Sequence, residues 1–313
     1  MMNYEAFKKE VEERFISYLP DEMKNMKVEF CQVNKVNRTL DGIRVFCKNT
    51  TWKIAPTIYI NEMYDLYQKN ESFEEALFIA VLNMSQVVQE IQTNTNINLD
   101  MSTAKDNIIF RVINTKQNSR LLENVPNRPF LDLSVIYCWI VRMGEDGFQS
   151  TVVNNRLAQS LELTEEDMFK LAVENTRRIL PPMVKELGDM IRKFLSPEFT
   201  DIPIWNSGND IWAITNARWI EGAGCILYED ELYALAESLE SDLYILPSSI
   251  HEMLAIPAEG DADKLSEIVA FVNMKDLALE ERLSNQVYRY DRKLRKLSLA
   301  TDTSNKNLDK LNE

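Results

Sequence analysis

Apolar positions along the chain predict amphipathic helices separated by short strands. They recur every three or four residues in several segments, as expected where one face of a helix is buried. Ser72 and Glu75 open the clearest of these segments as a capping box, and Thr164 with Asp167 give a second cap. The helices predicted in this way cover residues 3–19, 61–67, 72–91, 116–122, 165–179, 230–240 and the segment that Asp261 opens.

Strands are predicted between the helices, in short segments where apolar residues alternate with polar ones or follow one another without a break. We expect strands at residues 28–33, 42–48, 52–60, 107–114, 130–141, 148–154, 201–206, 211–216, 222–228, 242–247, 252–257 and 286–291. They come in groups with helices between the groups. This order is typical of an α+β fold with mainly antiparallel sheets and amphipathic helices packed on them.

Turns and proline residues set three further expectations. Residues 125–129 read as a turn that leads into one long buried strand at 130–141. A further helix is expected after Pro181 and Pro182, to about residue 194. Residues 201–206 and 211–216 are expected to form a hairpin.

The length of 313 residues allows one large domain or two ordinary ones. We divide the chain into an α+β part at 1–145, a second α+β part at 146–300 that contains the "PSSIH" turn, and a polar tail at 301–313. The alternative is that the two parts form one continuous domain.

The charge of the chain argues against two classes of partner. A net charge of −14 and the lack of a basic cluster disfavour nucleic acid and anionic membrane surfaces, which need grouped Lys and Arg. The first residues lack the apolar core of a signal peptide, and no segment has the 18 or so apolar residues of a membrane span. We therefore expect a cytoplasmic protein that binds neither nucleic acid nor a membrane.

Cysteine and histidine usage argues against a metal or cofactor site. The four cysteines are scattered through apolar runs, and His251 is the only histidine, so no zinc-ligand spacing exists. The chain also lacks a G-x-G-x-x-G fingerprint and a P-loop. We expect no metal, no cofactor and four reduced thiols.

The histidine lies in "PSSIHEM", where Ser248, Ser249, His251 and Glu252 combine types that hydrolases use. A catalytic set needs a base within hydrogen-bond reach of the hydroxyl and a third group that orients the base. Neighbours in sequence rarely satisfy both conditions, and no G-x-S-x-G elbow frames the serines. We predict a structural connection between two strands, with a hydrolase site as the alternative.

A second candidate nucleophile is Cys225, which Gly222 and Gly224 precede. The glycines would let a substrate approach the backbone, and His251 could activate the thiol. The alternative interpretation is a buried strand in which Cys225 is an ordinary core residue.

Two further groups are candidates for ligand binding. Arg128 and Asp132 flank the start of a long apolar strand and could form a structural ion pair or a binding pair. Trp205, Trp212 and Trp219 are spaced seven apart, so they form either an exposed aromatic platform or part of the core.

Several stretches together resemble a known bacterial family. They are "APTIYINEMYDLY", "NRPFLDLSVIY", "GAGCILY", "SDLYILPSSIHEMLAIP" and "LSNQVYRYD", in this order along the chain. The chain is similar in them to domain of unknown function family 5688, which is found mostly in gut-dwelling Clostridia. The resemblance implies a bacterial, intracellular protein but brings no activity. We predict a non-enzymatic protein that binds another protein or a small molecule, with a hydrolase using Ser248 or Cys225 with His251 as the alternative.

Overall fold

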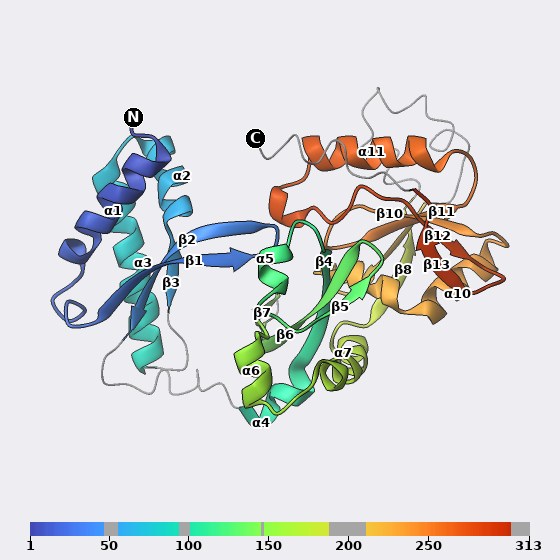
Figure 1. Cartoon of the computed structure of the whole chain (residues 1–313), viewed down its shortest axis with the longest axis horizontal. Coiled ribbons are helices and arrows are strands. Elements are labelled where there is room, and N and C mark those ends of the chain that lie inside the picture. The colour runs from blue at the N-terminus through green and yellow to red at the C-terminus, as the bar shows by residue number, and fades with distance from the viewer. Residues whose placement is uncertain (47–55, 94–100, 145–146, 188–210, 302–313) are drawn as a thin grey trace. The chain divides into compact units, whose positions relative to one another are not determined.

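The computed structural model describes residues 1–46, 56–93, 101–144, 147–187 and 211–301. Within these residues the fold is α+β, with helices packed on three antiparallel sheets, which confirms the fold class predicted from the sequence. The chain divides into two compact units, Met1–Asp100 and Met101–Glu313 (Figure 1).

The N-terminal unit combines one sheet with three helices. In chain order its elements are α1 (Tyr4–Tyr18), β1 (Lys27–Lys35), β2 (Arg38–Phe46), β3 (Thr57–Tyr59), α2 (Ile60–Asn70) and α3 (Phe73–Thr93). The strands pair in the order β1-β2-β3. A two-residue turn joins β1 to β2, with Asn37 at a φ of 61°. This turn is shorter than the gap of residues 34–41 between the two expected strands, and Asn37 tolerates the left-handed conformation that it adopts there.

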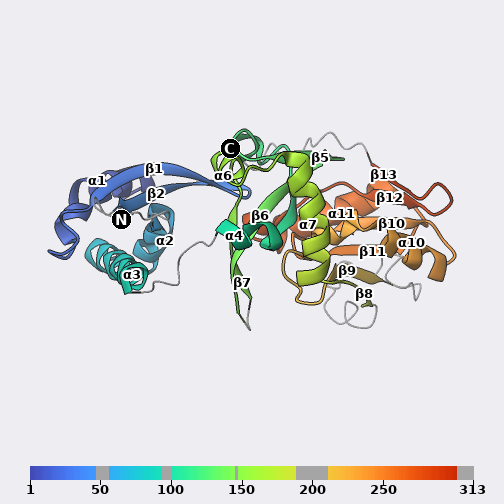
Figure 2. The same cartoon turned by 90° about the horizontal axis from the view of Figure 1, so that it is seen from below.

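Apolar stripes of the three helices make the core of this unit. Phe7, Val11 and Phe15 of α1 are fully buried, and so are Leu77 and Met84 of α3. The predicted cap of α3 is present, since Ser72 Oγ accepts a hydrogen bond from the Glu75 N–H at 3.2 Å. Figure 2 shows α3 on the side of the unit away from β1 and β2.

A four-stranded sheet begins the C-terminal unit. Its strands are β4 (Ile108–Asn114), β5 (Asn127–Phe130), β6 (Leu133–Met143) and β7 (Phe148–Val152). β6 pairs with β4 along one edge, while β5 and β7 pair with successive parts of its other edge. The boundary expected between residues 145 and 146 falls inside the β6–β7 hairpin; the division into separate domains stays a prediction.

The turn expected at 125–129 is wrong, and the long buried strand expected at 130–141 begins three residues later, at Leu133. Asn127–Phe130 is already a strand, and a two-residue turn at Leu131 and Asp132 separates it from β6. Leu131 has a φ of 58°, in the left-handed region that a leucine rarely adopts. Nothing in the apolar pattern signals a turn at a leucine.

The helix α7 (Glu165–Ile179) covers the free edge of β4. The Thr176 hydroxyl accepts a hydrogen bond from the Phe110 N–H at 3.1 Å, and the Asn175 amide donates to the Ile108 carbonyl at 3.0 Å. These side chains take the place of a neighbouring strand and block edge-to-edge pairing. The helix begins with the predicted capping box of Thr164 and Asp167. Shorter helical segments nearby are α4 (Met101–Ala104), η1 (Lys105–Asn107), α5 (Ser119–Leu122) and α6 (Asn155–Ser160).

The second sheet of this unit has six strands in the order β13-β12-β10-β11-β9-β8. They are β8 (Pro182–Glu186), β9 (Trp212–Asn216), β10 (Leu243–Pro247), β11 (Met253–Pro257), β12 (Tyr288–Asp291) and β13 (Lys296–Leu299). The helix expected after Pro181 and Pro182 is wrong at its start, because β8 occupies this segment. An edge strand tolerates a proline, since its N–H side has no partner to lose. The strand expected at 201–206 lies outside the described residues.

Helices fill the remaining positions around the six-stranded sheet. They are η3 (Gly222–Leu227), α10 (Glu229–Ser238), α11 (Ala262–Lys275) and η4 (Leu279–Glu281). α11 packs on the sheet through Leu265 and Val269, which contact a core that includes Leu246 and Ile256 (Figure 1). The strand expected at 222–228 is wrong, because "GAGCIL" forms the 3₁₀ helix η3. A short buried apolar run does not distinguish the two by periodicity. No helix in the described ranges is long and apolar enough to cross a bilayer.

Candidate functional site

The "PSSIH" segment is the connection between β10 and β11. The backbone N–H of Ser249 donates to the Glu252 carbonyl at 3.2 Å. The Ser249 hydroxyl accepts from the His251 N–H at 3.0 Å and donates to the Glu252 carboxylate at 3.1 Å. Ser249 is buried and Ser248 is half-buried. These contacts are the ones that a strand-to-strand turn needs, with a hydroxyl serving a backbone donor.

The imidazole of His251 is directed to a different loop. Its Nδ1 accepts a hydrogen bond from the Glu221 N–H at 3.1 Å, and its Nε2 lies 3.9 Å from the Glu281 carboxylate. The His251 carbonyl also accepts from the Thr215 hydroxyl at 2.8 Å. Within the described residues, no hydrogen bond joins the ring to Ser248, Ser249 or Cys225. The histidine therefore ties the β10–β11 turn to the segment between β9 and η3.

The glycines of "GAGC" serve close packing of the chain on itself. A Cβ at Gly222 would lie 2.6 Å from the His251 carbonyl oxygen and 2.8 Å from the Asn216 nitrogen. A Cβ at Gly224 would lie 2.7 Å from the Phe110 ring. The atoms that approach these glycines belong to the protein's own strands and turn. No substrate is needed to explain them.

The thiol of Cys225 lies in the core. It is 2% exposed, and burial, helped by the Glu231 carboxylate, raises its pKa to about 12. Nearly all of it is thus protonated at neutral pH, whereas a nucleophilic cysteine needs a thiolate. Burial likewise raises the pKa of Cys138 to about 11. Cys31 is half-buried, and Cys47 lies outside the described residues.

Arg128 and Asp132 each bind other residues rather than one another. The Arg128 guanidinium forms two hydrogen bonds with Glu165, at 3.0 and 2.9 Å, and also contacts Glu166. The Asp132 carboxylate accepts from Ser284 at 2.5 Å and from Tyr288 at 2.8 Å. Arg128 thus anchors the start of α7 to β5.

The partners of Asp132 belong to a buried polar segment that sequence reasoning passed over. Residues 283–288 are almost fully buried although they include Ser284, Asn285 and Gln286. Each polar group is bonded: the Asn273 amide, for example, donates to the Ser284 carbonyl at 2.9 Å. The sequence does contain a signal for this segment, because the polar run stands directly before the strand sequence "VYRYD".

The tryptophans differ in their surroundings. Trp212 on β9 is half-buried, and its indole nitrogen has no hydrogen-bond partner within the described residues. Trp219 is half-buried with a φ of 57°, and the Lys185 ammonium lies 6.0 Å from the centroid of its ring. Trp205 lies outside the described residues. A shared aromatic platform stays a prediction.

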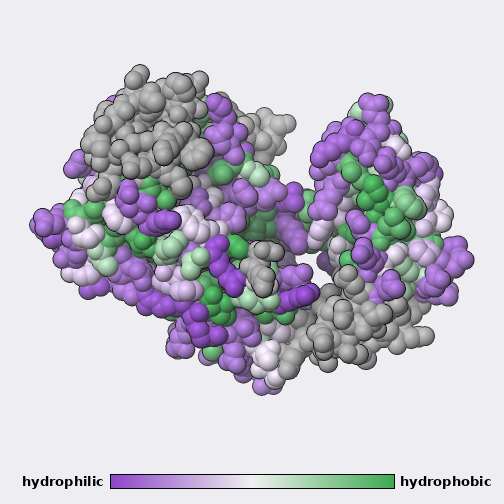
Figure 3. All heavy atoms as spheres, turned by 180° about the vertical axis from the view of Figure 1, so that it is seen from behind, coloured by the Kyte–Doolittle hydropathy of each residue, from purple (hydrophilic) through white to green (hydrophobic). Residues whose placement is uncertain are grey.

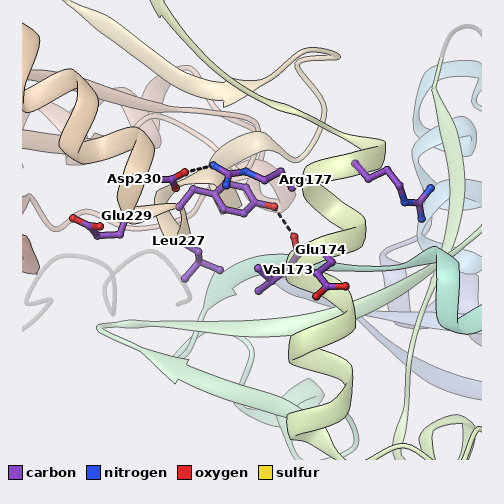
Figure 4. Close-up of a pocket in the computed structure, with 8 residues that line it drawn as sticks. Val173, Glu174, Arg177, Leu227, Glu229 and Asp230 are labelled. Carbon is purple, nitrogen blue, oxygen red and sulfur yellow. Dashed lines mark hydrogen bonds and ion pairs between the residues drawn. The ribbon is translucent and has the colours of Figure 1, made fainter.

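A hollow of about 680 Å³ lies between α7 and the start of α10 (Figure 4). The Arg177 guanidinium lies over the Tyr228 ring, 4.8 Å from its centroid, and pairs with Asp230 at 2.5 Å. The Tyr228 hydroxyl donates to the Val173 carbonyl at 3.2 Å. Arg177, Asp230 and Tyr228 therefore already have partners within the protein for these polar groups. The residues that line the hollow are Val173, Glu174, Arg177, Arg178, Leu227, Tyr228, Glu229 and Asp230.

The outer face of α3 is unusual for a surface helix. Phe78 is 55% exposed, Leu82 51% and Val87 42%. No residue from 76 to 89 carries a charge, although 27% of the whole chain is charged. Figure 3 shows hydrophobic residues gathered over α3 on this face of the N-terminal unit. A helix with only one buried face normally places charged residues on the other.

In the described ranges, no three His, Cys, Asp or Glu side chains come together as metal ligands. A family model described as a family of unknown function, DUF5688, matches residues 4–292. The chain belongs to this family. The matched range includes residues of both units and ends before β13. No curated protein and no solved structure matches the chain.

Proposed function

We propose that this DUF5688 protein is a non-enzymatic interaction protein that binds a partner protein through the outer face of α3. The observation that carries the proposal is the exposure of Phe78 and Leu82, one turn apart on α3, within a helix stretch that has no charged residue. Contiguous exposed apolar surface of this kind marks interaction sites, and aromatic side chains are enriched in them. We call Phe78, Ile79 and Leu82 the α3 patch.

The hydrolase alternative has less support. The His251 ring accepts a backbone N–H at Nδ1, the Ser249 hydroxyl donates to Glu252, and Cys225 is a buried, protonated thiol. A general base must reach the proton that it abstracts, and none of these contacts places His251 on a nucleophile. The binding interpretation needs no such arrangement.

Site-specific photo-crosslinking tests the proposal. A photoreactive amino acid at position 82 should capture a partner protein in extracts of cells that make this protein, and excess unlabelled wild type should compete. Excess Phe78→Lys protein should not compete, because a charge within the patch opposes desolvation. The control position is Lys264, an exposed residue of α11. Equal capture at both positions, or competition by Phe78→Lys, would refute the proposal.

A further inference from the structure

We infer that His251 is a pH-sensitive switch in the C-terminal unit: the neutral imidazole binds the Glu221 N–H, and the protonated ring leaves it for the Glu281 carboxylate. This inference is independent of the α3 patch and of the function proposed for it. It gives a role to the histidine that the proposed function does not use.

The two ring nitrogens of His251 face different partners. Nδ1 accepts a hydrogen bond from the Glu221 N–H at 3.1 Å, and Nε2 lies 3.9 Å from the Glu281 carboxylate. A neutral imidazole has one donor and one acceptor nitrogen, so the proton of the neutral ring is on Nε2. The second proton must therefore bind Nδ1, which then becomes a donor. Protonation thus breaks the hydrogen bond to Glu221.

The Glu281 carboxylate is the charged group that the protonated ring can bind. It lies on η4 next to Glu280 and is 42% exposed. Within the described residues, no other cation lies within 4.0 Å of it. The strand β9 and the helix η3, which also contact the β10–β11 turn, contain no charged residue. Glu252 of the turn itself accepts from the Ser249 hydroxyl at 3.1 Å.

The other charged side chains near this site have partners of their own. The Glu221 carboxylate accepts from the Arg111 guanidinium at 2.8 Å. Arg218 donates to the Gly144 carbonyl at 3.0 Å, and Arg282, which follows η4, donates to a backbone carbonyl at 3.2 Å. Each of these contacts is made without the imidazole, so protonation of His251 removes none of them directly.

The backbone around His251 is fixed by bonds that do not involve the ring. The Thr215 hydroxyl donates to the His251 carbonyl at 2.8 Å, and the Ala223 N–H donates to the Ile250 carbonyl at 3.2 Å. The side chain of His251 is 31% exposed, so the ring can turn toward Glu281 without opening the β10–β11 turn. Acidification should therefore release Glu221 while the six-stranded sheet stays folded.

Glu221 is held in an unfavourable backbone conformation. Its φ is 54° and that of Trp219 is 57°, in the left-handed region that residues other than glycine rarely adopt. The Asn216 side chain ties the middle of this segment, because it accepts from the Arg218 N–H at 3.0 Å and donates to the Ile220 carbonyl at 2.7 Å. Glu221 lies beyond these bonds and depends on the imidazole as the acceptor for its N–H. Loss of that acceptor should therefore act on Glu221 first.

Amide hydrogen exchange, measured by NMR on the full-length protein, tests the inference. Imidazole is the side chain that ordinarily changes charge between pH 5 and 8, and His251 is the only histidine in the chain. After correction for intrinsic exchange rates, protection of the Glu221 amide should fall about five- to tenfold from pH 8 to pH 5, as expected for the loss of one hydrogen bond. The Phe110 amide, which donates to the Thr176 hydroxyl at 3.1 Å, is the internal control and should keep its protection.

Two substitutions separate the switch from a general effect of acid. In His251→Gln the side-chain oxygen can accept the Glu221 N–H but does not titrate, so Glu221 should stay protected at both pH values. Glu281→Gln removes the negative charge beside the ring and should move the loss of protection to lower pH. Glu259→Gln, at an exposed loop residue, should not.

Two results would overturn the assignment of His251 as the switch. The first is a Glu221 amide that stays protected at pH 5 in the wild type. The second is an equal loss of protection in the wild type and in His251→Gln. An unchanged pH dependence in Glu281→Gln would overturn the part of the inference that makes Glu281 the second partner.

Discussion

Gly222→Ala should strongly destabilise the C-terminal unit. The added Cβ would lie 2.2 Å from the Thr215 hydroxyl oxygen, 2.6 Å from the His251 carbonyl oxygen and 2.8 Å from the Asn216 nitrogen. All three distances are well inside van der Waals contact, and two of the three atoms are backbone that a rotamer change cannot move. Overpacking of this kind costs about 1–3 kcal/mol or more. In a unit of about this size, each kcal/mol lowers the melting temperature by roughly 2–4 °C.

Two glycines provide a graded comparison with Gly222. At Gly224 the Cβ would meet the Phe110 ring at 2.7 Å, which is a side chain that can shift, so Gly224→Ala should cost less. At Gly144 the nearest atom would be 3.4 Å away, so Gly144→Ala should lie within about 0.5 kcal/mol of wild type.

Urea unfolding followed by tryptophan fluorescence measures the effect on the C-terminal unit. Four of the five tryptophans belong to residues 101–313 and report on this unit. The midpoints of unfolding should fall in the order Gly144→Ala, Gly224→Ala, Gly222→Ala, with the slope unchanged. An unchanged midpoint for Gly222→Ala would refute the close packing of η3 on β9 and the β10–β11 turn.

The remaining four predictions concern side-chain hydrogen bonds and buried thiols. Thr176→Val should lower the free energy of unfolding by about 1–3 kcal/mol, because the Phe110 N–H at the edge of β4 loses its acceptor; equal urea midpoints would contradict this. His251→Ala should cost a similar amount through the lost acceptor at Nδ1, with no change in hydrolysis of ester, amide or phosphoester substrates; a mutant that keeps its melting temperature but loses a wild-type activity would restore the hydrolase hypothesis. Cys138 and Cys225 should react with a thiol reagent at pH 8 only after unfolding, and rapid labelling of either would count against their burial. Because burial raises both thiol pKa values, to about 11 and about 12, the stability that they contribute should be complete below about pH 9 and decline as pH rises toward 12, as pH-dependent unfolding would show.

Sequence patterns predict the helices and strands whose boundaries depend on residues close together in the chain. The helix at 165–179 was predicted to the residue because Thr164 and Asp167 form a capping box and Pro181 follows its end. The strands β6 and β7, which pair in a hairpin, were predicted from their apolar runs. The strand β8 was missed because its stability comes from β9, about 30 residues later, rather than from its own proline-rich sequence.

For the candidate site residues too, the sequence predicts contacts between neighbours but not contacts between distant segments. The "PSSIH" turn was predicted from Pro247 and the serines, which act on their immediate neighbours. The hydrogen-bond partner of the His251 imidazole was not predicted, because Glu221 is 30 positions away and offers a backbone N–H that no sequence pattern marks. The α3 patch could have been found: the charge-free stretch at 76–89 and the apolar residues at 78, 79 and 82, opposite the predicted buried stripe, are visible in the sequence.

The bonds of Asp132 to Ser284 and Tyr288 also have a consequence for synthesis of the chain. The carboxylate is made 152 residues before the first of these partners and 156 before the second. A ribosome that adds about 5–20 residues per second produces that length in roughly 8–30 s. For this interval the β4–β7 sheet can pair its strands, but the carboxylate at its β5–β6 turn has neither of the hydroxyls that it binds in the finished fold. Final docking of the two sheets is therefore a late event, and a nascent chain stalled before residue 284 would hold the first sheet with a solvated Asp132.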